Sequence, residues 1–135
     1  MLIDKETKLY LDKRILDNSL NHHELSPTQL RNERLRQLAK DNLKGPELSN
    51  VYQMEVGDDK HYKIKLRIYV PFSIKKNKNY PVTLFFHGGG FVMGNLETHD
   101  HPCRCIAKFS ENIVIAVDYS LAPEFKFPKP LNDAK

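Results

Sequence analysis

The stretch Val82–Gly94, which reads VTLFFHGGGFVMG, constrains the fold of this chain more than any other. Its first five residues, Val82–Phe86, are β-branched, aromatic or leucine, and Pro81 precedes them. A short and continuous apolar run of this kind predicts a strand that is buried on both faces. A histidine and three adjacent glycines follow it directly. The sequence therefore predicts a buried strand that ends in a loop with unusual backbone freedom.

The three glycines favour the binding of a negatively charged oxygen. Adjacent glycines can adopt positive φ angles, and without a Cβ their N–H groups can approach a ligand closely. N–H groups gathered at the end of a strand commonly stabilise a developing oxyanion. A bare glycine run also occurs in flexible turns, but the preceding strand and the aromatic Phe91 favour the anion-binding interpretation. We therefore expect His87 to orient the loop and an oxyanion hole to be formed by Gly88, Gly89 and Gly90.

Further motifs follow at a specific spacing. Val117–Glu124 reads VDYSLAPE, and Phe127-Pro128 and Asp133-Ala134 come after it. Together with the HGGG loop, these residues resemble the hormone-sensitive lipase family of α/β-hydrolases, which reads HGGG, then DYRLAPE, then FPAxxxDA. The resemblance covers roughly residues 50–135.

This resemblance implies an α/β fold and lipase-like or esterase chemistry. The expected fold is the N-terminal portion of an α/β-hydrolase sheet, with antiparallel first strands, a parallel βαβ unit and N-terminal cap helices. The expected reaction is attack of a serine on a small carboxylic ester, with the glycine loop holding the tetrahedral oxygen. Neither a metal nor an organic cofactor is implied. Ser120 stands where the family has arginine, which removes a cation that could pair with Glu124.

The catalytic triad of such an enzyme is missing from this sequence. In that family a G-x-S-x-G nucleophile elbow follows the motifs above, and the acid and the histidine come later still. No serine here stands between two suitably spaced glycines. We therefore expect no catalytic residue in this chain, which corresponds to the N-terminal part of an esterase and is inactive by itself. The alternative is a non-catalytic fragment or a small binding or regulatory module derived from the hydrolase fold.

Residues 1–48 are expected to form cap-type helices, and residues 49–135 a truncated hydrolase core. The clearest helix start is at Ser26, where Pro27 suits the first helical position and Gln29 completes a capping box. Gly45-Pro46 is expected to end this helix. We expect the helix to be only loosely tied to the sheet.

The core begins with two alternating segments that predict an antiparallel strand pair. In the second of them, isoleucine and leucine alternate with Lys63, Lys65, Arg67 and Tyr69, which predicts a strand with one solvated face. After the glycine loop, Thr98 is expected to cap a helix on which Cys103 packs inward.

Residues 113–118 then form a second buried strand and complete a right-handed βαβ unit. As the last parallel strand of an incomplete sheet, this segment is expected to lack an outer neighbour. Such an exposed apolar edge favours self-association.

The composition of the chain limits the kinds of partner that we expect it to bind. The net charge of +4 comes from scattered residues without a dense basic block, which argues against nucleic-acid binding. Two cysteines only two positions apart suit neither a disulfide framework nor a zinc site. The first residues are charged throughout and lack the apolar stretch of a signal peptide, so we expect no secretory signal, and no apolar run is long enough to span a membrane. We expect a cytoplasmic protein whose partner is a small-molecule ester.

Overall fold

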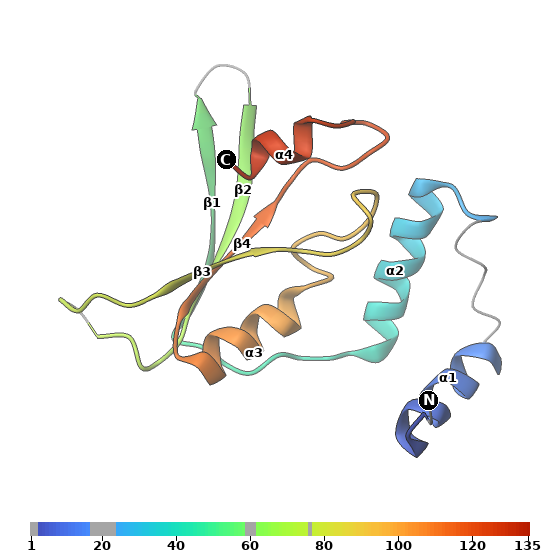
Figure 1. The fold of residues 1–135 in the computed structure, drawn as a ribbon. Coiled ribbons are helices and arrows are strands. Elements are labelled where there is room, and N and C mark those ends of the chain that lie inside the picture. Colours follow the sequence, from blue (N-terminus) through green and yellow to red (C-terminus); the bar gives the residue numbers. More distant parts are fainter. Residues whose placement is uncertain (1–2, 17–23, 59–61, 76) are drawn as a thin grey trace.

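A mixed four-stranded sheet forms the centre of the molecule, with the strand order β1-β2-β4-β3. The computed structural model describes residues 3–16, 24–58, 62–75 and 77–135. The strands are β1 Asn50–Asp58, β2 Tyr62–Val70, β3 Val82–Phe86 and β4 Ile113–Asp118. β1 and β4 both pair antiparallel with β2, whereas β3 runs parallel to β4. The predicted antiparallel pair and the predicted parallel βαβ unit are both confirmed (Figure 1).

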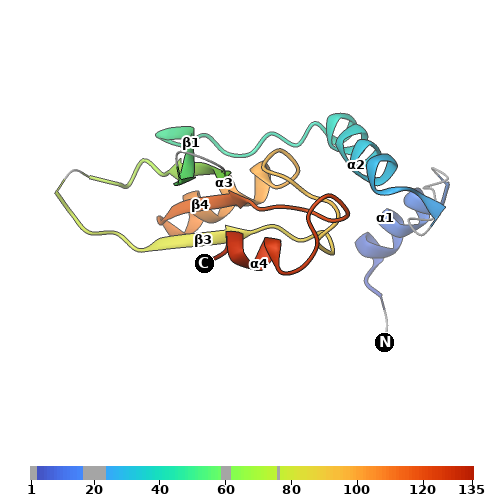
Figure 2. The same cartoon turned by 90° about the horizontal axis from the view of Figure 1, so that it is seen from above.

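The helices are α1 Lys5–Leu16, α2 Pro27–Asp41, α3 Asp100–Ser110 and α4 Lys129–Asp133. In Figure 1 the sheet is seen edge-on, with α3 below it and α4 above it. Figure 2 shows α1 and α2 together beside the sheet. None of the described helices has both the length and the apolar composition needed to cross a lipid bilayer.

The hydrophobic core lies between α3 and one face of the sheet. Cys103 and Ala107 of α3 are fully buried and pack in one cluster with Tyr69, Val114 and Ala116 of β2 and β4. The inward packing predicted for Cys103 is therefore confirmed. Burial raises the pKa of its thiol to about 11, so the thiol is protonated at neutral pH.

The prediction of one solvated face on β2 is only partly right. Lys63 and Lys65 are exposed, but Arg67 and Tyr69 on the same face are buried beneath the start of α3. Arg67 forms ion pairs with Glu97 and, at 3.1 Å, with Asp100. A buried guanidinium needs such partners, because its transfer from water is costly.

The sheet edge differs from the prediction in two ways. β4 is not an edge strand, because it lies between β2 and β3. Of the two parallel strands, β3 is the one without a second described neighbour, and it is not buried on both faces. Its alternate residues Val82, Leu84 and Phe86 are 52%, 59% and 42% exposed. The apolar run identified a strand correctly, but the described chain covers only the face of β3 that carries Phe85.

The predicted start of α2 is confirmed. Ser26 is the N-cap, and its side chain accepts a hydrogen bond from the Gln29 N–H while the Gln29 side chain accepts one from the Ser26 N–H. The helix ends earlier than predicted, at Asp41, because Asn42 adopts the left-handed conformation that closes a helix. No residue of α2 is buried.

The predicted start of α3 is wrong by one residue. His99 is the N-cap residue, and its side chain makes no capping hydrogen bond. The Thr98 hydroxyl instead accepts a hydrogen bond from the Asn95 N–H, and the Asn95 side chain accepts one from the Thr98 N–H. This reciprocal pair closes the turn that leads into the helix.

We predict that Ser26→Ala destabilises α2 by about 1 kcal/mol, because the Gln29 N–H loses its partner. Hydrogen exchange of residues 27–41 measures the change. Thr28→Ala removes an exposed hydroxyl from the same turn without touching the cap, and it should leave the exchange rates nearly unchanged. Equal effects of the two substitutions would refute the capping role.

Candidate active site

The glycine loop follows β3 directly and closes into a tight turn. The Gly89 carbonyl accepts hydrogen bonds from the N–H groups of Val92 and Met93, at 3.1 and 3.0 Å. Gly89 has a φ of +138°, and a Cβ at this position would lie 1.9 Å from the Met93 carbonyl oxygen. Only glycine fits this position without displacing the turn.

The N–H groups of this loop are free to bind a ligand. Within the described chain, none of the N–H groups of Gly88, Gly89 and Gly90 donates a hydrogen bond. A Cβ placed on Gly88 or Gly90 would meet no described atom within 4 Å, so the loop faces open space there. Unpaired N–H groups at the carboxyl end of a strand form a natural site for a negatively charged oxygen.

His87 lies beneath the loop in a stack of aromatic rings. Its ring packs on Tyr119 at 4.3 Å and on His99 at 5.3 Å between centroids. The Tyr119 hydroxyl donates to the His87 carbonyl at 2.5 Å, so the stack also holds the backbone at the end of β3. The His87 ring is buried, and its Nε2 atom has no hydrogen-bond partner among the described residues. Burial lowers the pKa of the neighbouring His99 and so favours its neutral form.

Arg31 connects α2 to the loop and was not identified from the sequence. Its Nε donates to the Val92 carbonyl at 2.8 Å, and one of its Nη atoms donates to the Ala122 carbonyl at 2.8 Å. The same guanidinium binds both oxygens of Glu124, at 2.8 and 2.9 Å. One side chain thus joins α2, the glycine loop and the segment after β4. The sequence indicated this contact only indirectly. Ser120 replaces the arginine that could pair with Glu124, so Glu124 needs a cation from elsewhere in the chain.

Ser120 takes part in a different polar cluster. Its N–H donates to Asp133 Oδ2 at 2.8 Å, and its hydroxyl lies 2.5 Å from the hydroxyl of Tyr62. Lys129 pairs with the other oxygen of Asp133 at 3.0 Å. Burial alone would raise the pKa of Asp133, but the hydrogen bonds from Ser120, Tyr62 and Lys129 outweigh it and leave the pKa below its ordinary value. This cluster ties α4 to β2.

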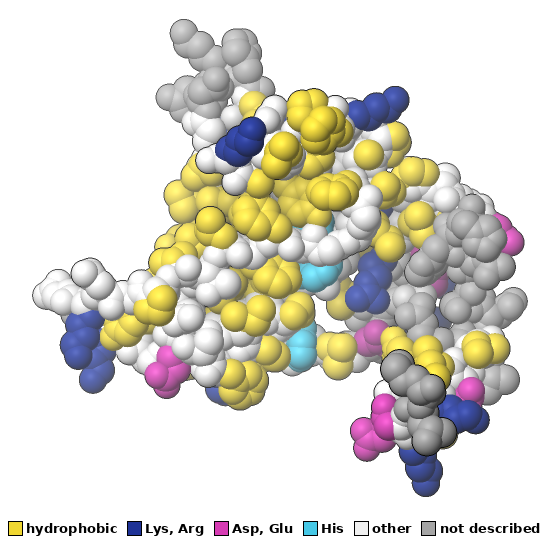
Figure 3. Space-filling view, viewed as in Figure 1, with side chains coloured by type: hydrophobic (Ala, Val, Ile, Leu, Met, Phe, Trp, Pro, Cys, Tyr) yellow, Lys and Arg dark blue, Asp and Glu magenta, His cyan; other side chains and the backbone are white. Residues whose placement is uncertain are grey.

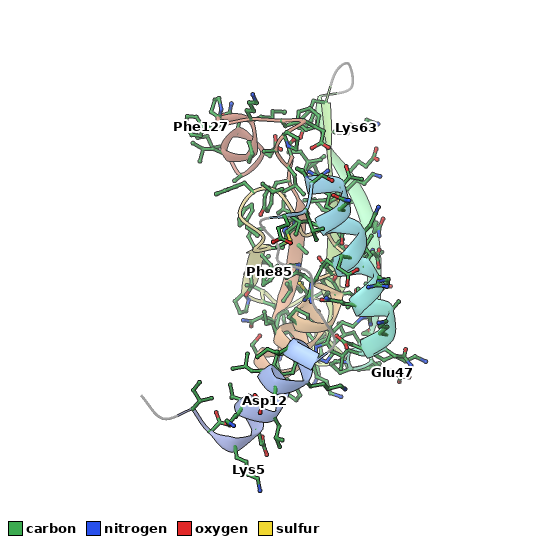
Figure 4. All side chains as sticks on the ribbon, turned by 90° about the vertical axis from the view of Figure 1, so that its right-hand side faces the viewer. Lys5, Asp12, Glu47, Lys63, Phe85 and Phe127 are labelled. Atoms are coloured by element: carbon green, nitrogen blue, oxygen red, sulfur yellow. The ribbon has the colours of Figure 1, made fainter. Side chains whose placement is uncertain are left out.

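A largely hydrophobic cavity of 520 Å³ adjoins the loop. The residues on either side of the glycines line it, and α4 and the segment before it close the other side. Figure 4 shows Phe85 in the middle of the molecule and Phe127 at the end where α4 lies. The lining residues are Phe86, His87, Phe91, Tyr119, Ala122, Phe125, Phe127, Pro130, Leu131 and Ala134.

The described residues contain no serine side chain that is hydrogen-bonded to a histidine. The hydroxyl of Ser120 faces Tyr62, and the hydroxyl of Ser110 donates to a carbonyl of its own helix. Within residues 3–16, 24–58, 62–75 and 77–135 there is also no group of three or more His, Cys, Asp or Glu residues that could hold a metal ion. The described site is thus a set of backbone donors beside an apolar cavity.

Comparison with known proteins agrees with this geometry. Residues 83–135 match a family model described as alpha/beta hydrolase fold. Esterase LipI of Mycobacterium tuberculosis is 51% identical over 71 residues, which are 53% of this chain and 22% of LipI. A hyperthermophilic esterase from the archaeon Pyrobaculum calidifontis superposes with a TM-score of 0.84 at 29% identity, over 99% of this chain and 42% of that chain. An ester hydrolase, EH1AB1, from the metagenome of Lake Arreo gives 0.81 at 32% identity, over 98% and 42%.

The chain therefore has an α/β-hydrolase fold. Its motifs and the esterases that it matches are similar to the hormone-sensitive lipase-like family within that fold, as the sequence predicted. The chain spans 42% of the length of the matched structures, and the stretch that matches LipI covers 22% of LipI.

We predict that Arg31→Ala releases both α2 and the glycine loop. Hydrogen exchange should become faster across residues 27–41 and at the amides of Val92 and Met93, because Arg31 provides the polar link between these segments. Arg36→Ala is the matched control, since Arg36 lies on the same helix and, among the described residues, forms its ion pair with Glu33 of that helix. If Arg36→Ala had the same effect on the loop, a specific role of Arg31 would be excluded.

We also predict a pH dependence of this link. The hydrogen bonds from Arg31 lower the pKa of Glu124 to about 2 from an ordinary value of 4.5. The link is therefore fully formed above the ordinary pKa and is lost as the pH falls through the lowered one. In an NMR titration, Glu124 should still be ionised at about pH 3.5, whereas in Arg31→Ala its pKa should return toward the ordinary value. Identical titration of the two proteins would contradict the contact.

Proposed function

We propose that this chain is the oxyanion-binding part of a serine carboxylesterase that acts on short-chain esters. Residues 1–48 would serve as the cap and residues 49–135 as part of the catalytic core. The observation that carries the proposal is the set of unpaired N–H groups at Gly88, Gly89 and Gly90, which adjoin an apolar cavity. A small ester could place its acyl group in that cavity and its carbonyl oxygen against the loop.

The proposed roles follow from this geometry. The N–H groups of Gly88 and Gly89, with that of Gly90 as a further donor, would bind the oxygen that becomes negative when a serine attacks the ester carbon. Each such donor contributes about 3 kcal/mol in the transition state, because it is already oriented before charge develops. His87 would hold the loop in place through its ring stack rather than transfer a proton. The serine, the acid and the histidine of the triad would come from the part of the hydrolase fold that this chain does not span.

The proposal predicts that residues 1–135 alone do not hydrolyse p-nitrophenyl acetate. A fusion of residues 1–135 to the part of LipI that follows the matched stretch should hydrolyse it, and its activity should depend on a serine from the LipI part. Turnover by residues 1–135 alone, abolished by changing one of its own serines, would refute this division of roles.

The oxyanion role is tested at Gly88, where a side chain has room. In the fusion protein, Gly88→Pro removes one N–H donor and should lower kcat by about 10²- to 10³-fold with little change in KM. Gly88→Ala keeps the donor and is the matched control, with kcat expected within a few-fold of the parent. An equal loss of activity in both variants would show that space, not hydrogen bonding, matters at this position.

A further inference from the structure

Asp133 of α4 is a buried carboxylate with three polar partners. Its side chain is 1% exposed, so hydrogen bonds and a counter-charge must replace the water that it loses. Its Oδ2 atom accepts hydrogen bonds from the Ser120 N–H and the Tyr62 hydroxyl, both at 2.8 Å. Lys129 lies 3.0 Å from its Oδ1 atom and is the only cation among the described residues that pairs with it. One lysine thus balances the charge of this carboxylate.

Positions 120 and 129 both differ from the motif of the hormone-sensitive lipase family. The motif has arginine and alanine at these positions, where this chain has Ser120 and Lys129. The side chain of Ser120 points to Tyr62, because the two hydroxyl oxygens lie 2.5 Å apart. Glu124 is bound by Arg31 instead. The chain therefore lacks a cation at one position and has one at the other, and both positions adjoin the same buried carboxylate.

The ring of Tyr62 fixes where the ammonium group of Lys129 lies. The Nζ atom is 2.9 Å from the ring centroid. A cation over the face of a tyrosine ring is attracted to it, and the attraction is stronger where water is partly excluded. The Lys129 side chain is 33% exposed, so it is partly shielded in this position. The tyrosine, which begins β2, thus contacts both the lysine and the carboxylate of Asp133.

This cluster provides the polar attachment of α4 to the rest of the chain. Among the described residues, the ion pair and the side-chain hydrogen bonds of α4 are made by Lys129 and Asp133. Pro130 and Leu131, with Ala134 directly after the helix, line the cavity beside the glycine loop. Figure 3 shows hydrophobic side chains gathered over α4 and the segment beside it, with basic side chains at the edge of this surface. The position of this cavity wall therefore depends on the cluster.

We propose that Lys129 is a positioning residue that gives Asp133 the cation which the family motif carries at position 120, and that it thereby holds α4 as one wall of the cavity. The transfer of the cation from position 120 to position 129 concerns this chain by itself. The effect on the cavity rests on the proposed function, in which the acyl group of an ester lies in that cavity.

A double-substitution cycle in residues 1–135 tests the transfer of the cation. Lys129→Ala should raise the pKa of Asp133 by about one unit or more in an NMR titration, because a cation no longer offsets its burial. Ser120→Arg alone places a second cation beside the same carboxylate and should lower the urea midpoint of unfolding. The double variant Ser120→Arg/Lys129→Ala carries the motif residues at both positions. It should return the pKa and the urea midpoint most of the way to the parent values.

Further variants separate the charge of the lysine from its packing. Lys129→Arg keeps the cation and should keep the pKa of Asp133 low. Lys129→Met keeps most of the apolar stem and should raise the pKa as Lys129→Ala does. Lys126→Ala is the matched control, because Lys126 is an exposed lysine of the same segment. It forms no ion pair within the described chain, so the pKa and the urea midpoint should not change.

Binding of methyl hexanoate to residues 1–135 tests the effect on the cavity. The methyl signals of Leu131 and Ala134 should shift when the ester binds, because both residues line the cavity. In Lys129→Ala the dissociation constant should rise about tenfold, since part of the apolar contact with the ester is lost when α4 is no longer held. The double variant and Lys129→Arg should restore binding, whereas a general loss of stability would not be reversed in this pattern.

Three results would overturn the proposal. One is an unchanged pKa of Asp133 in both Lys129→Ala and Lys129→Met. Another is a double variant whose loss of stability equals the sum of the two single losses, because coupled residues do not behave additively. The third is equal binding of methyl hexanoate by Lys129→Ala and the parent. If the ester binds to none of the proteins although the pKa changes as expected, the proposed function is contradicted and the pairing of Lys129 with Asp133 stands.

Discussion

The packing of α3 on β4 is the interaction on which the rest of this structure depends. Cys103 and Ala107 meet Val114 and Ala116 in a fully or nearly fully buried contact. The contact closes the β3–α3–β4 unit and sets β3 parallel to β4. Parallel strands end at the same edge of a sheet, so the glycine loop after β3 and the segment after β4 become neighbours there. The stack of His87 on Tyr119 is the direct consequence, since His87 directly follows β3 and Tyr119 directly follows β4.

Two arginines extend this unit in different ways. Arg67 is buried, and its ion pairs with Glu97 and Asp100 hold β2 against the start of α3. Removing one partner of such a buried cluster is more damaging than its net stabilisation suggests, because a desolvated charge is left unpaired. Arg31 is more exposed and uses its planar group to bind two carbonyl oxygens and a carboxylate together. The first arginine stabilises the core, and the second holds a helix without buried residues against the glycine loop.

Much of the local structure could be predicted from the sequence, because it depends on neighbouring residues. The capping box at Ser26 and the inward packing of Cys103 are examples, and the structure confirms both. The contacts of Arg31 could not be predicted, since they join residues 61 to 93 positions apart. The order of the strands was also missed. A sequence pattern identifies a strand, but it does not say on which side of its partner that strand lies.

The burial of β3 in the structure differs from the burial that its sequence predicts, and this difference has a physical meaning. The composition of Val82–Phe86 is that of a strand with both faces buried. In the described chain, however, three of these five side chains are exposed. Exposed valine, leucine and phenylalanine side chains do not stabilise the fold, because each forgoes the free energy of about 1.5–3 kcal/mol that its burial would contribute. Apolar residues at such positions are expected where that face is covered in the working protein. The mismatch between the pattern and the burial is therefore found at the same edge of the sheet at which His87 Nε2 lacks a described partner.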